Sequence, residues 1–534
     1  MRLGGNLVAM AALALACGER PRPPNVLFCI SDDQSWKHVS AVGTRAVETP
    51  SFDRLAAGGV RFEHAFANAP ACAPSRAAIL TGRPVWTLGE GACHGSRFPT
   101  AWPTLTEILE REGYAVGHTG KGWGPGTLAD GITRNPAGSE WNERKSPTPR
   151  GISDRDYAAN FADFLESRNP GQPFFFWYGA HEPHRSYARG LGARQGKRIQ
   201  DVDVPGFLPD TPEVRSDLLD YFAEIEWFDA QLARILATLE EAGELANTLV
   251  IVTSDNGMPF PRAKSNLYDY GSRVPLAVAW RDRIPGGRVV TDFVTLAELA
   301  PTILEAAGIR APTTMLERSL LSVLTSHAEG RVERERDHVV LARERHTWCN
   351  PAPSIAPMRA IRTDRWLYLR NLRPEVWPAG HPQGRFNHNL LPFGEVDGSP
   401  TKWLLVEQRP AYQRLFELAF GKRPAEELYD LQGDPEQLEN LAADPQQAPL
   451  LRRLRGRLDL MLTQSGDPRA IGNGAIFDDA SYFGSHGVAT GGLMLRDWEA
   501  LPGDEQLDQR QRASERARSL GALRDAGADR KGSR

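Results

Sequence analysis

Apolar runs with the pattern of buried strands alternate with helical patterns through the first two thirds of this 534-residue chain. The clearest strands are NVLFCI, PFFFWYGA and TLVIVTS. One helix is expected from Pro50 to Gly58 and a much longer one from Pro212 to Gly243. This alternation predicts an α/β fold, in which a large, mostly parallel sheet is flanked by helices on both faces.

The pattern changes beyond about Met358, where MRAIRTDRWLYLRNL alternates as antiparallel strands do. Just before this change, VTLAELAPTILEAAGI predicts a helix that Pro301 breaks or kinks. We therefore expect a large domain over 24–355 and a smaller α+β domain over 356–503, built around an antiparallel sheet. A charged tail, rich in Arg, Asp and Glu, covers 504–534.

The N-terminus has the features of an export signal. The apolar stretch LVAMAALALA is too short to span a bilayer, and Cys17 and the polar ERPRPP follow it. We predict a signal peptide over 1–17 and a periplasmic or cell-surface location. Ala14 and Ala16 also resemble a bacterial lipoprotein cleavage box, so plain cleavage and lipid attachment at Cys17 both remain open.

Net charge and cysteine content exclude several classes of function. A formal charge of −4 favours neither nucleic acid nor an anionic membrane as a partner, so a lipid on Cys17 is the only membrane contact we expect. Five cysteines are too few for a disulfide scaffold. Cys29 lies inside an apolar strand, where a buried thiol is ordinary, whereas Cys72 in PACAPSRAAILTGRP needs an explanation of its own.

Two acidic pairs directly follow predicted strands. NVLFCI runs into Asp32 and Asp33, and TLVIVTS runs into Asp255 and Asn256. The carboxyl ends of parallel strands form the ligand crevice of an open α/β sheet, so these side chains can converge. Their hard oxygen donors suit Ca²⁺ or Mg²⁺. Each pair alone could equally be a turn, because Asp and Asn are common there.

Taken with these acids, the segment around Cys72 resembles the formylglycine-dependent sulfatases of the alkaline phosphatase superfamily. The resemblance is carried by Cys72-Ala73-Pro74-Ser75-Arg76, which has the C-x-P-S-R pattern, and by LTGR shortly after it. FCISDDQS, GHTGKGWGPG, GAHEPHR, TSDNG and EELYDLQGDPEQLENLA resemble further segments of that family. In this family the motif cysteine is oxidised to formylglycine, which would make Cys72 a precursor of the nucleophile.

One branch of the family fits best. SDNGMPFPRAKSNLYDYG, HEPHR, PGFLPDTPEVRSDL and ERHTWCNPAPSIAPMRAIRT look most like the N-sulfoglucosamine sulfohydrolases, or sulfamidases, and their bacterial relatives. This resemblance implies removal of sulfate from the amine of glucosamine in heparin or heparan sulfate. The implied partners are a sulfated saccharide substrate and a formylglycine-generating enzyme.

The resemblance also implies a role for each matching residue. One hydroxyl of the hydrated aldehyde at position 72 would attack sulfur, and the second would then expel the sulfate. Arg76 would hold the hydrate, while Lys121 and Lys264 would contact the sulfate. His184 would protonate or stabilise the leaving group, with His181 a weaker candidate that contacts substrate. One Ca²⁺ would be bound by Asp32, Asp33, Cys72, Asp255 and Asn256.

Arg343, Glu344 and His346 in ARERHTW resemble a loop that reaches the sulfamidase pocket, although a charged surface loop explains them as well. One departure from the family pattern is Trp123, which stands where many members have a histidine two positions after the active-site lysine. Tryptophan cannot accept a proton, so either another group, such as His94 or His118, takes that task, or water or a carboxylate does.

Three rival functions remain open at this stage. The first is O-sulfatase activity on another sulfated glycan, because residues that bind sulfate contact the same group whether it is attached to nitrogen or to oxygen. The second is a phosphodiesterase or phosphonate hydrolase of the same superfamily, which would need more histidines and a second cation. The third is a non-catalytic sugar-binding relative. The sugar, exo or endo action and the oligomeric state are not determined by the sequence.

Overall fold

The structure is a computed structural model that describes residues 22–281, 283–350, 355–384 and 391–484. The predicted signal peptide, Cys17 and the predicted tail over 504–534 lie outside the described residues. Among the residues described, no helix is long and apolar enough to cross a membrane.

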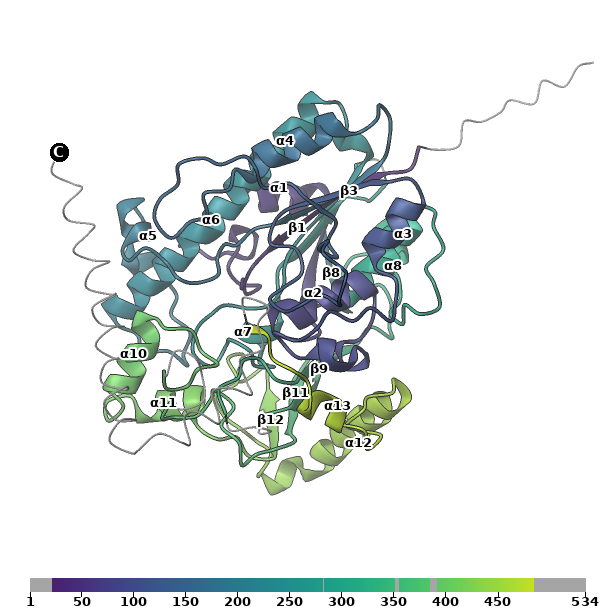
Figure 1. Ribbon diagram of the computed structural model, residues 1–534. Coiled ribbons are helices and arrows are strands. Elements are labelled where there is room, and N and C mark those ends of the chain that lie inside the picture. The colour runs from purple at the N-terminus through teal and green to yellow at the C-terminus, as the bar shows by residue number, and fades with distance from the viewer. Residues whose placement is uncertain (1–21, 282, 351–354, 385–390, 485–534) are drawn as a thin grey trace, which may run out of the picture.

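The large sheet has eight strands and is mostly parallel, as predicted (Figure 1). β7 runs antiparallel to both of its neighbours, β6 and β2. In spatial order the strands are β4 (Ser139–Glu140), β3 (Ala115–Gly120), β5 (Phe174–Gly179), β1 (Asn25–Ser31), β6 (Thr248–Ser254), β7 (Leu276–Ala279), β2 (Val60–Phe66) and β8 (Arg288–Thr295).

Helices cover both faces of this sheet because its central strands are apolar on both. Phe28 of β1 belongs to one core cluster and Cys29 to the other, as the alternation of side chains along a strand requires. The first cluster includes α2 (Cys72–Thr81), α3 (Leu105–Arg111) and α8 (Leu299–Ala306). The second includes α1 (Pro50–Gly58), α4 (Tyr157–Ser167) and α6 (Pro212–Glu241).

The helix expected around Pro301 begins later than the sequence suggests. The segment that starts at Val294 is still the end of β8, and a short 3-10 turn precedes α8. Pro301 therefore lies in the first turn of α8, where a missing amide hydrogen breaks no helical hydrogen bond.

A second, antiparallel sheet follows, in the order β12 (Glu426–Asp430), β11 (Trp366–Asn371), β10 (Met358–Thr363) and β9 (His338–Arg343). β9 lies before residue 356, so this sheet begins earlier in the chain than the boundary that we predicted. The remaining helices are α5 (Leu191–Arg194), α7 (Asp269–Ser272), α9 (Leu321–Thr325), α10 (Pro400–Glu407), α11 (Gln413–Phe420), α12 (Ala448–Gln464) and α13 (Ala475–Asp478).

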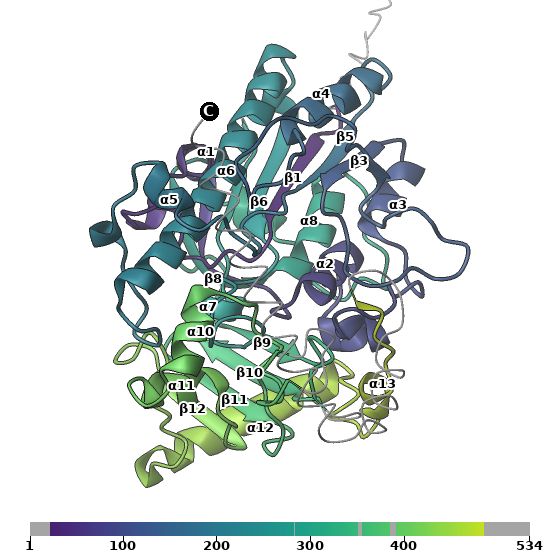
Figure 2. The same cartoon turned by 60° about the vertical axis from the view of Figure 1, so that its left-hand side comes forward.

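The two sheets share a hydrophobic core. Leu341 and Leu369 of the small sheet cluster with Phe66 and Phe293, which come from β2 and β8 of the large one. α12 packs on the small sheet, and its Leu458 joins the core cluster of α2. Figure 2 shows the small sheet with α10, α11 and α12 directly below the large sheet. The C-terminal part is therefore placed to supply residues to the same edge as α2.

A buried ion-pair network fastens the end of α12 to β10. Arg359 is fully buried and donates two hydrogen bonds to Asp467, of 2.8 and 2.9 Å, and one of 2.7 Å to Glu344. Asp467 is also fully buried. Removing one partner of a buried pair leaves an uncompensated charge, which is more destabilising than losing a surface pair.

We therefore expect Asp467→Ala to lower the free energy of unfolding by about 3–5 kcal/mol. Asp479→Ala, at an exposed position nearby, should change it by less than about 0.5 kcal/mol. Urea denaturation followed by tryptophan fluorescence measures both. Equal effects of the two substitutions would show that the buried pair contributes no special stability.

Candidate active site

Neighbouring parallel strands of the large sheet end at the same level. Ile30 of β1 lies opposite Gly179 of β5 and Thr253 of β6, and Gly120 of β3 also lies opposite Gly179. The residues that follow these strand ends therefore start from one edge of the sheet. They are Lys121 after β3, His181 and His184 after β5, Asp32 and Asp33 after β1, and Asp255 and Asn256 after β6.

The predicted acidic residues converge there. Carboxylate oxygens of Asp32, Asp33 and Asp255 and the sulfur of Cys72 all lie within 4.8 Å of one another, and all four residues are buried. Asp33 has a left-handed φ of 76°, a conformation that Asp tolerates better than most residues. Its backbone N–H donates to Asp255 Oδ1 at 3.1 Å, which ties the ends of β1 and β6 together.

Asn256 completes a set of hard oxygen donors. Its Nδ2 donates to Asp33 Oδ1 at 2.6 Å and to the Gly257 carbonyl at 3.0 Å, which fixes the orientation of the amide. Its Oδ1 is buried and accepts no hydrogen bond from any described residue. Three clustered carboxylates are the oxygen donors that Ca²⁺ or Mg²⁺ takes, and an adjacent amide with an unpartnered oxygen can add a further one. The residues present therefore fit a divalent metal.

Three cationic side chains compensate the carboxylates. Lys121 Nζ lies 2.5 Å from Asp32 Oδ2, and Lys264 Nζ contacts Asp33 Oδ2. Arg76 is fully buried and donates from Nε to Asp255 Oδ2 at 2.8 Å. The same guanidinium donates to the carbonyls of Lys121 and Gly122, at 2.7 and 2.9 Å, so its position is fixed on two sides.

These contacts shift the pKa values of the cluster in opposite directions. Burial would raise the pKa of Asp32, but the nearby cationic groups, Lys121 first, together outweigh burial and hold that pKa well below its usual range. Burial and then the charge of Asp32 raise the pKa of Asp255 to about 6. Burial and then Asp32 also hold the pKa of the Cys72 thiol well above its ordinary value. The thiol is therefore protonated at neutral pH, and it donates to Asp32 Oδ1 at 3.3 Å.

Cys72 is the first residue of α2 and is only 2% exposed. Pro74 lies in the first turn, where it needs no helical partner for an amide hydrogen. The helix ends at Gly82, whose φ of 60° suits glycine. Free amides and the dipole at the start of a helix favour an anion, so this is a suitable place for a group that binds sulfate.

The two histidines after β5 have different surroundings. His184 Nδ1 donates to the Arg185 carbonyl at 2.6 Å, and its Nε2 lies 3.8 Å from Asp33 Oδ2. The side chain is 35% exposed, so it can reach a substrate. His181 Nε2 instead accepts from Arg155 at 3.0 Å, and burial and then Arg155 lower its pKa to about 3. His181 is therefore a neutral side chain held by a cation.

Trp123 has a structural task in this structure. Its indole Nε1 donates to the carbonyl of Ala73 at 3.0 Å, and its ring packs edge-on against Phe98. His118 bonds the Gly138 carbonyl, and His94 pairs with the His346 carbonyl, both at 3.1 Å. Cys72 hydrogen-bonds to Asp32, and among the described residues neither histidine hydrogen-bonds to Cys72, so neither takes the place of the family histidine by a direct hydrogen bond.

The charged residues of the ARERHTW segment have different partners. Arg343 donates to the Pro378 carbonyl at 2.7 Å and lies 3.6 Å from Glu395, and its Nε and Nη1 have no hydrogen-bond partner among the described residues. Glu344 belongs to the Arg359 network described above. His346 donates to Glu395 at 2.7 Å and faces His94, with ring centroids 4.4 Å apart.

Asp397 is a site residue that the sequence analysis missed. It comes from the C-terminal part, lies 3.5 Å from Lys264, and groups with Asp33 and His184 within 4.8 Å. Lys264 and other cations outweigh its burial and lower its pKa to about 2, so it is ionised. Its segment, GEVDGSP, carries no motif that could have identified it.

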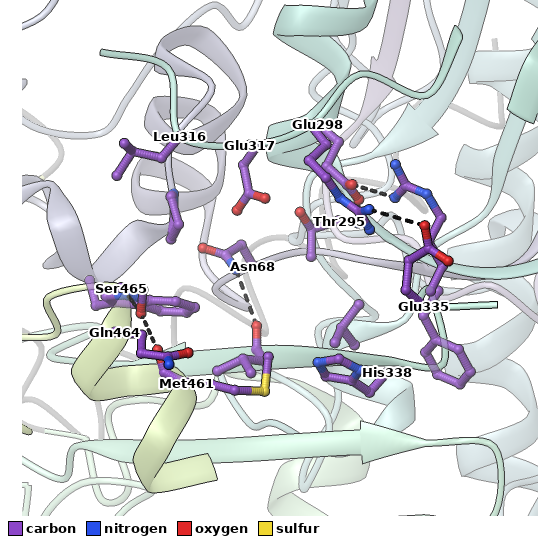
Figure 3. Close-up of a pocket in the computed structure, with 17 residues that line it drawn as sticks. Asn68, Thr295, Glu298, Leu316, Glu317, Glu335, His338, Met461, Gln464 and Ser465 are labelled. Atoms are coloured by element: carbon purple, nitrogen blue, oxygen red, sulfur yellow. Dashed lines mark hydrogen bonds and ion pairs between the residues drawn. The ribbon is translucent and has the colours of Figure 1, made fainter. Parts of the chain in front are cut away.

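A cavity of about 610 Å³ opens from Asp32 and Lys121 and continues past His181 and His184 to Glu224 of α6. A second cavity, of about 490 Å³, lies between the end of α12 and the end of β8 (Figure 3). Asn68, Glu298 and Glu317 line this second cavity, but no predicted site residue does. Of the converged residues, Asp32, Lys121, His181 and His184 line the first cavity.

The geometry predicts one divalent cation, bound in part by Asn256. In titration calorimetry with Ca²⁺ and with Mg²⁺, we expect one equivalent to bind. Asn256→Ala should weaken the affinity by about 10- to 100-fold or more, because it removes the unpartnered acceptor without exposing a charge. Asp203→Ala, on the exposed surface, is the matched control. Equal affinity of the two variants would rule out this ligand set.

Comparison with known proteins agrees with this architecture. The family model described as Sulfatase matches residues 24–309, and the one described as N-sulphoglucosamine sulphohydrolase, C-terminal, matches residues 262–377. The chain is 30% identical to human N-sulphoglucosamine sulphohydrolase over 498 residues, which cover 86% of this chain and 94% of that protein. It is 26% identical to an ulvan-active sulfatase of Formosa agariphila, covering 84% and 76% of the two chains.

Solved structures share the fold. One is a complex with D-glucosamine-2-N,6-O-disulfate, described as that protein's substrate, with a TM-score of 0.57, 20% identity and coverage of 83% of this chain and 98% of that one. Another is the phosphonate monoester hydrolase of Agrobacterium radiobacter, with a TM-score of 0.56, 20% identity and coverage of 83% and 96%. The chain belongs to the sulfatase family, whose members are hydrolases that act on sulfate esters.

Proposed function

We propose that this protein removes sulfate from N-sulfated glucosamine in saccharides of the heparin and heparan sulfate type, using formylglycine made from Cys72 and one Ca²⁺. The observation that carries the proposal is the convergence of Cys72, Lys121, Lys264 and His184 on one buried carboxylate cluster. The likeness to human N-sulphoglucosamine sulphohydrolase along nearly its whole length supports the choice of substrate.

The state of Cys72 argues that it acts after conversion. A thiol is nucleophilic as its thiolate, whereas burial first, and then the charge of Asp32, raise the pKa of this thiol and keep it protonated. Formylglycine supplies a hydroxyl nucleophile in its hydrated form, and the bound cation supplies positive charge beside it. Asp32, which accepts from position 72, is placed to hold the proton of that hydroxyl.

The charge balance of the site suits an anionic substrate. Asp32, Asp33 and Asp255 are matched by Arg76, Lys121 and Lys264. Asp397 adds one more negative charge, so a bound divalent cation would still leave the sum positive. Cationic groups that are fixed before the substrate arrives can stabilise the charge on sulfuryl oxygens at no cost of reorganisation.

His184 is the best placed group for the leaving atom. The carbonyl of Arg185 can only accept a hydrogen bond, so the Nδ1 of His184 carries a proton and its Nε2 faces the site. When the ring is protonated, Nε2 can donate to the departing amine or hydroxyl. Lys264, between Asp33 and Asp397, offers a second donor on the same side.

One feature disfavours a phosphate-directed enzyme with two cations. Asp33, His184 and Asp397 could hold a second ion by their spacing. However, the ammonium group of Lys264 already contacts Asp33 and lies 3.5 Å from Asp397. A side-chain cation therefore supplies positive charge where a second metal would be needed.

Export and domain organisation complete the proposal. The leader over 1–17 supports a periplasmic or cell-surface enzyme that reaches extracellular saccharides, with or without a lipid on Cys17. Residues 24–355 would form the sulfatase catalytic domain and the following segment a smaller domain that contributes Asp397.

Protein co-produced with a formylglycine-generating enzyme should release inorganic sulfate from glucosamine N-sulfate. Cys72→Ala should reduce the rate by about 10³-fold or more, because it removes the nucleophile. Lys264→Ala should reduce kcat by about 10²- to 10³-fold, the usual effect of losing one fixed donor to a developing charge.

Asp203→Asn, at an exposed position, is the control and should keep the full rate. Release of sulfate from glucosamine 6-O-sulfate but not from glucosamine N-sulfate would contradict the proposed bond and favour an O-sulfatase. Release that survives Cys72→Ala would contradict the mechanism.

A further inference from the structure

The cavity that opens from the catalytic centre has more room than a sulfate needs. From Asp32 and Lys121 it continues between the loop at Gly151–Ser153 and α6, over a volume of about 610 Å³. A sugar whose sulfate lies at the carboxylate cluster would therefore extend toward α6. The polar groups of that wall then decide which sugar fits.

Glu224 of α6 is the unusual group in this wall. The residue is 1% exposed, and its Oε1 is buried without a hydrogen-bond partner among the described residues. A Cβ on Gly151, across from it, would lie only 3.3 Å from Oε1. Gly151 has a φ of 98°, which favours glycine, and the loop passes close to this oxygen. Buried polar atoms are rarely left unpartnered, and Glu224 is one of the residues that line the cavity.

Among the described residues, Glu224 forms no salt bridge with a cation. The nearby guanidinium of Arg185 donates to both carboxylate oxygens of Asp217, at 2.7 and 2.8 Å, and to the Pro259 carbonyl at 2.9 Å. Burial first, and then Glu182, raise the pKa of Glu224 well above its ordinary value, against a smaller effect of Arg185. Burial without a paired cation thus favours the neutral carboxylic acid, which offers one donor and one acceptor.

We propose that Glu224 is a specificity-determining residue that binds a hydroxyl group of the sugar bearing the scissile sulfate. The inference rests on the proposed function and adds the residue that distinguishes this saccharide from other sulfated compounds. A hydroxyl both donates and accepts, which matches an acid with an unpartnered oxygen. A second sulfate can only accept, and it would bring negative charge close to Glu182 and Glu224, so the position selects an uncharged group.

Binding to protein without the nucleophile tests this directly. The parent is Cys72→Ala loaded with Ca²⁺, and the probes are glucosamine N-sulfate and inorganic sulfate, both measured by calorimetry. Adding Glu224→Met keeps the side-chain volume and removes the hydrogen bonds. We expect this substitution to weaken the affinity for glucosamine N-sulfate by about 3- to 10-fold, the effect of one hydrogen bond. The affinity for inorganic sulfate should be unchanged.

Two further variants control the experiment. Glu224→Gln keeps a donor and an acceptor, so it should bind the sugar within about twofold of the parent. Glu241→Ala, at the exposed end of the same helix, should have no effect. The thermal midpoint of Glu224→Met should not fall, because the substitution removes an unsatisfied buried group.

The possible failures are distinguishable. If Glu224→Met lowered the affinity for both probes equally, Glu224 would only support the fold. If it left the affinity for the sugar unchanged, Glu224 would contact no hydroxyl group. Either result overturns the inference and leaves the proposed function intact. A parent that binds inorganic sulfate but not glucosamine N-sulfate would contradict the proposed function, and this inference with it.

Discussion

Compensation of buried carboxylates is the constraint on which the site depends. Asp32, Asp33 and Asp255 are at most 1% exposed, and burying three like charges together is prohibitive unless each is paired. Arg76, Lys121 and Lys264 provide the pairs. The same groups that make the cluster stable therefore also make it a fixed, positively charged receptor once a divalent cation is bound.

Only a sheet with level strand ends can assemble these groups from such distant parts of the chain. The pairing of β1 with β5 and β6, and of β5 with β3, brings their carboxyl ends to one edge. The small sheet shares a core with β2 and β8, and the C-terminal part of the chain contributes Asp397, which lies 3.5 Å from Lys264. The C-terminal part is thus a component of the site. Within that part, the buried Arg359 network holds the end of α12 against β10.

Much of this was predictable from the sequence because its signals are local. Strands that run directly into Asp32 or Asp255, the motif at Cys72 and the long helix from Pro212 each lie within one continuous segment. What could not be predicted depends on packing between segments. Asp397 enters from a loop without a motif, Trp123 became a partner of the Ala73 carbonyl, and β9 joined the second sheet before the predicted boundary. The contact between Arg343 and substrate stays a prediction; in the structure this side chain is held by the Pro378 carbonyl and lies beside Glu395.

The central claim is that Cys72 is the precursor of the nucleophile, and the mass of the tryptic peptide over residues 62–76, from protein purified from its natural source, tests it most directly. The account predicts a peptide in which the CH₂SH group has become an aldehyde that reacts with a hydrazine probe. A peptide that carries only an unmodified thiol, fully alkylated by iodoacetamide, would contradict it, because a buried and protonated thiol beside Asp32 cannot perform the proposed chemistry.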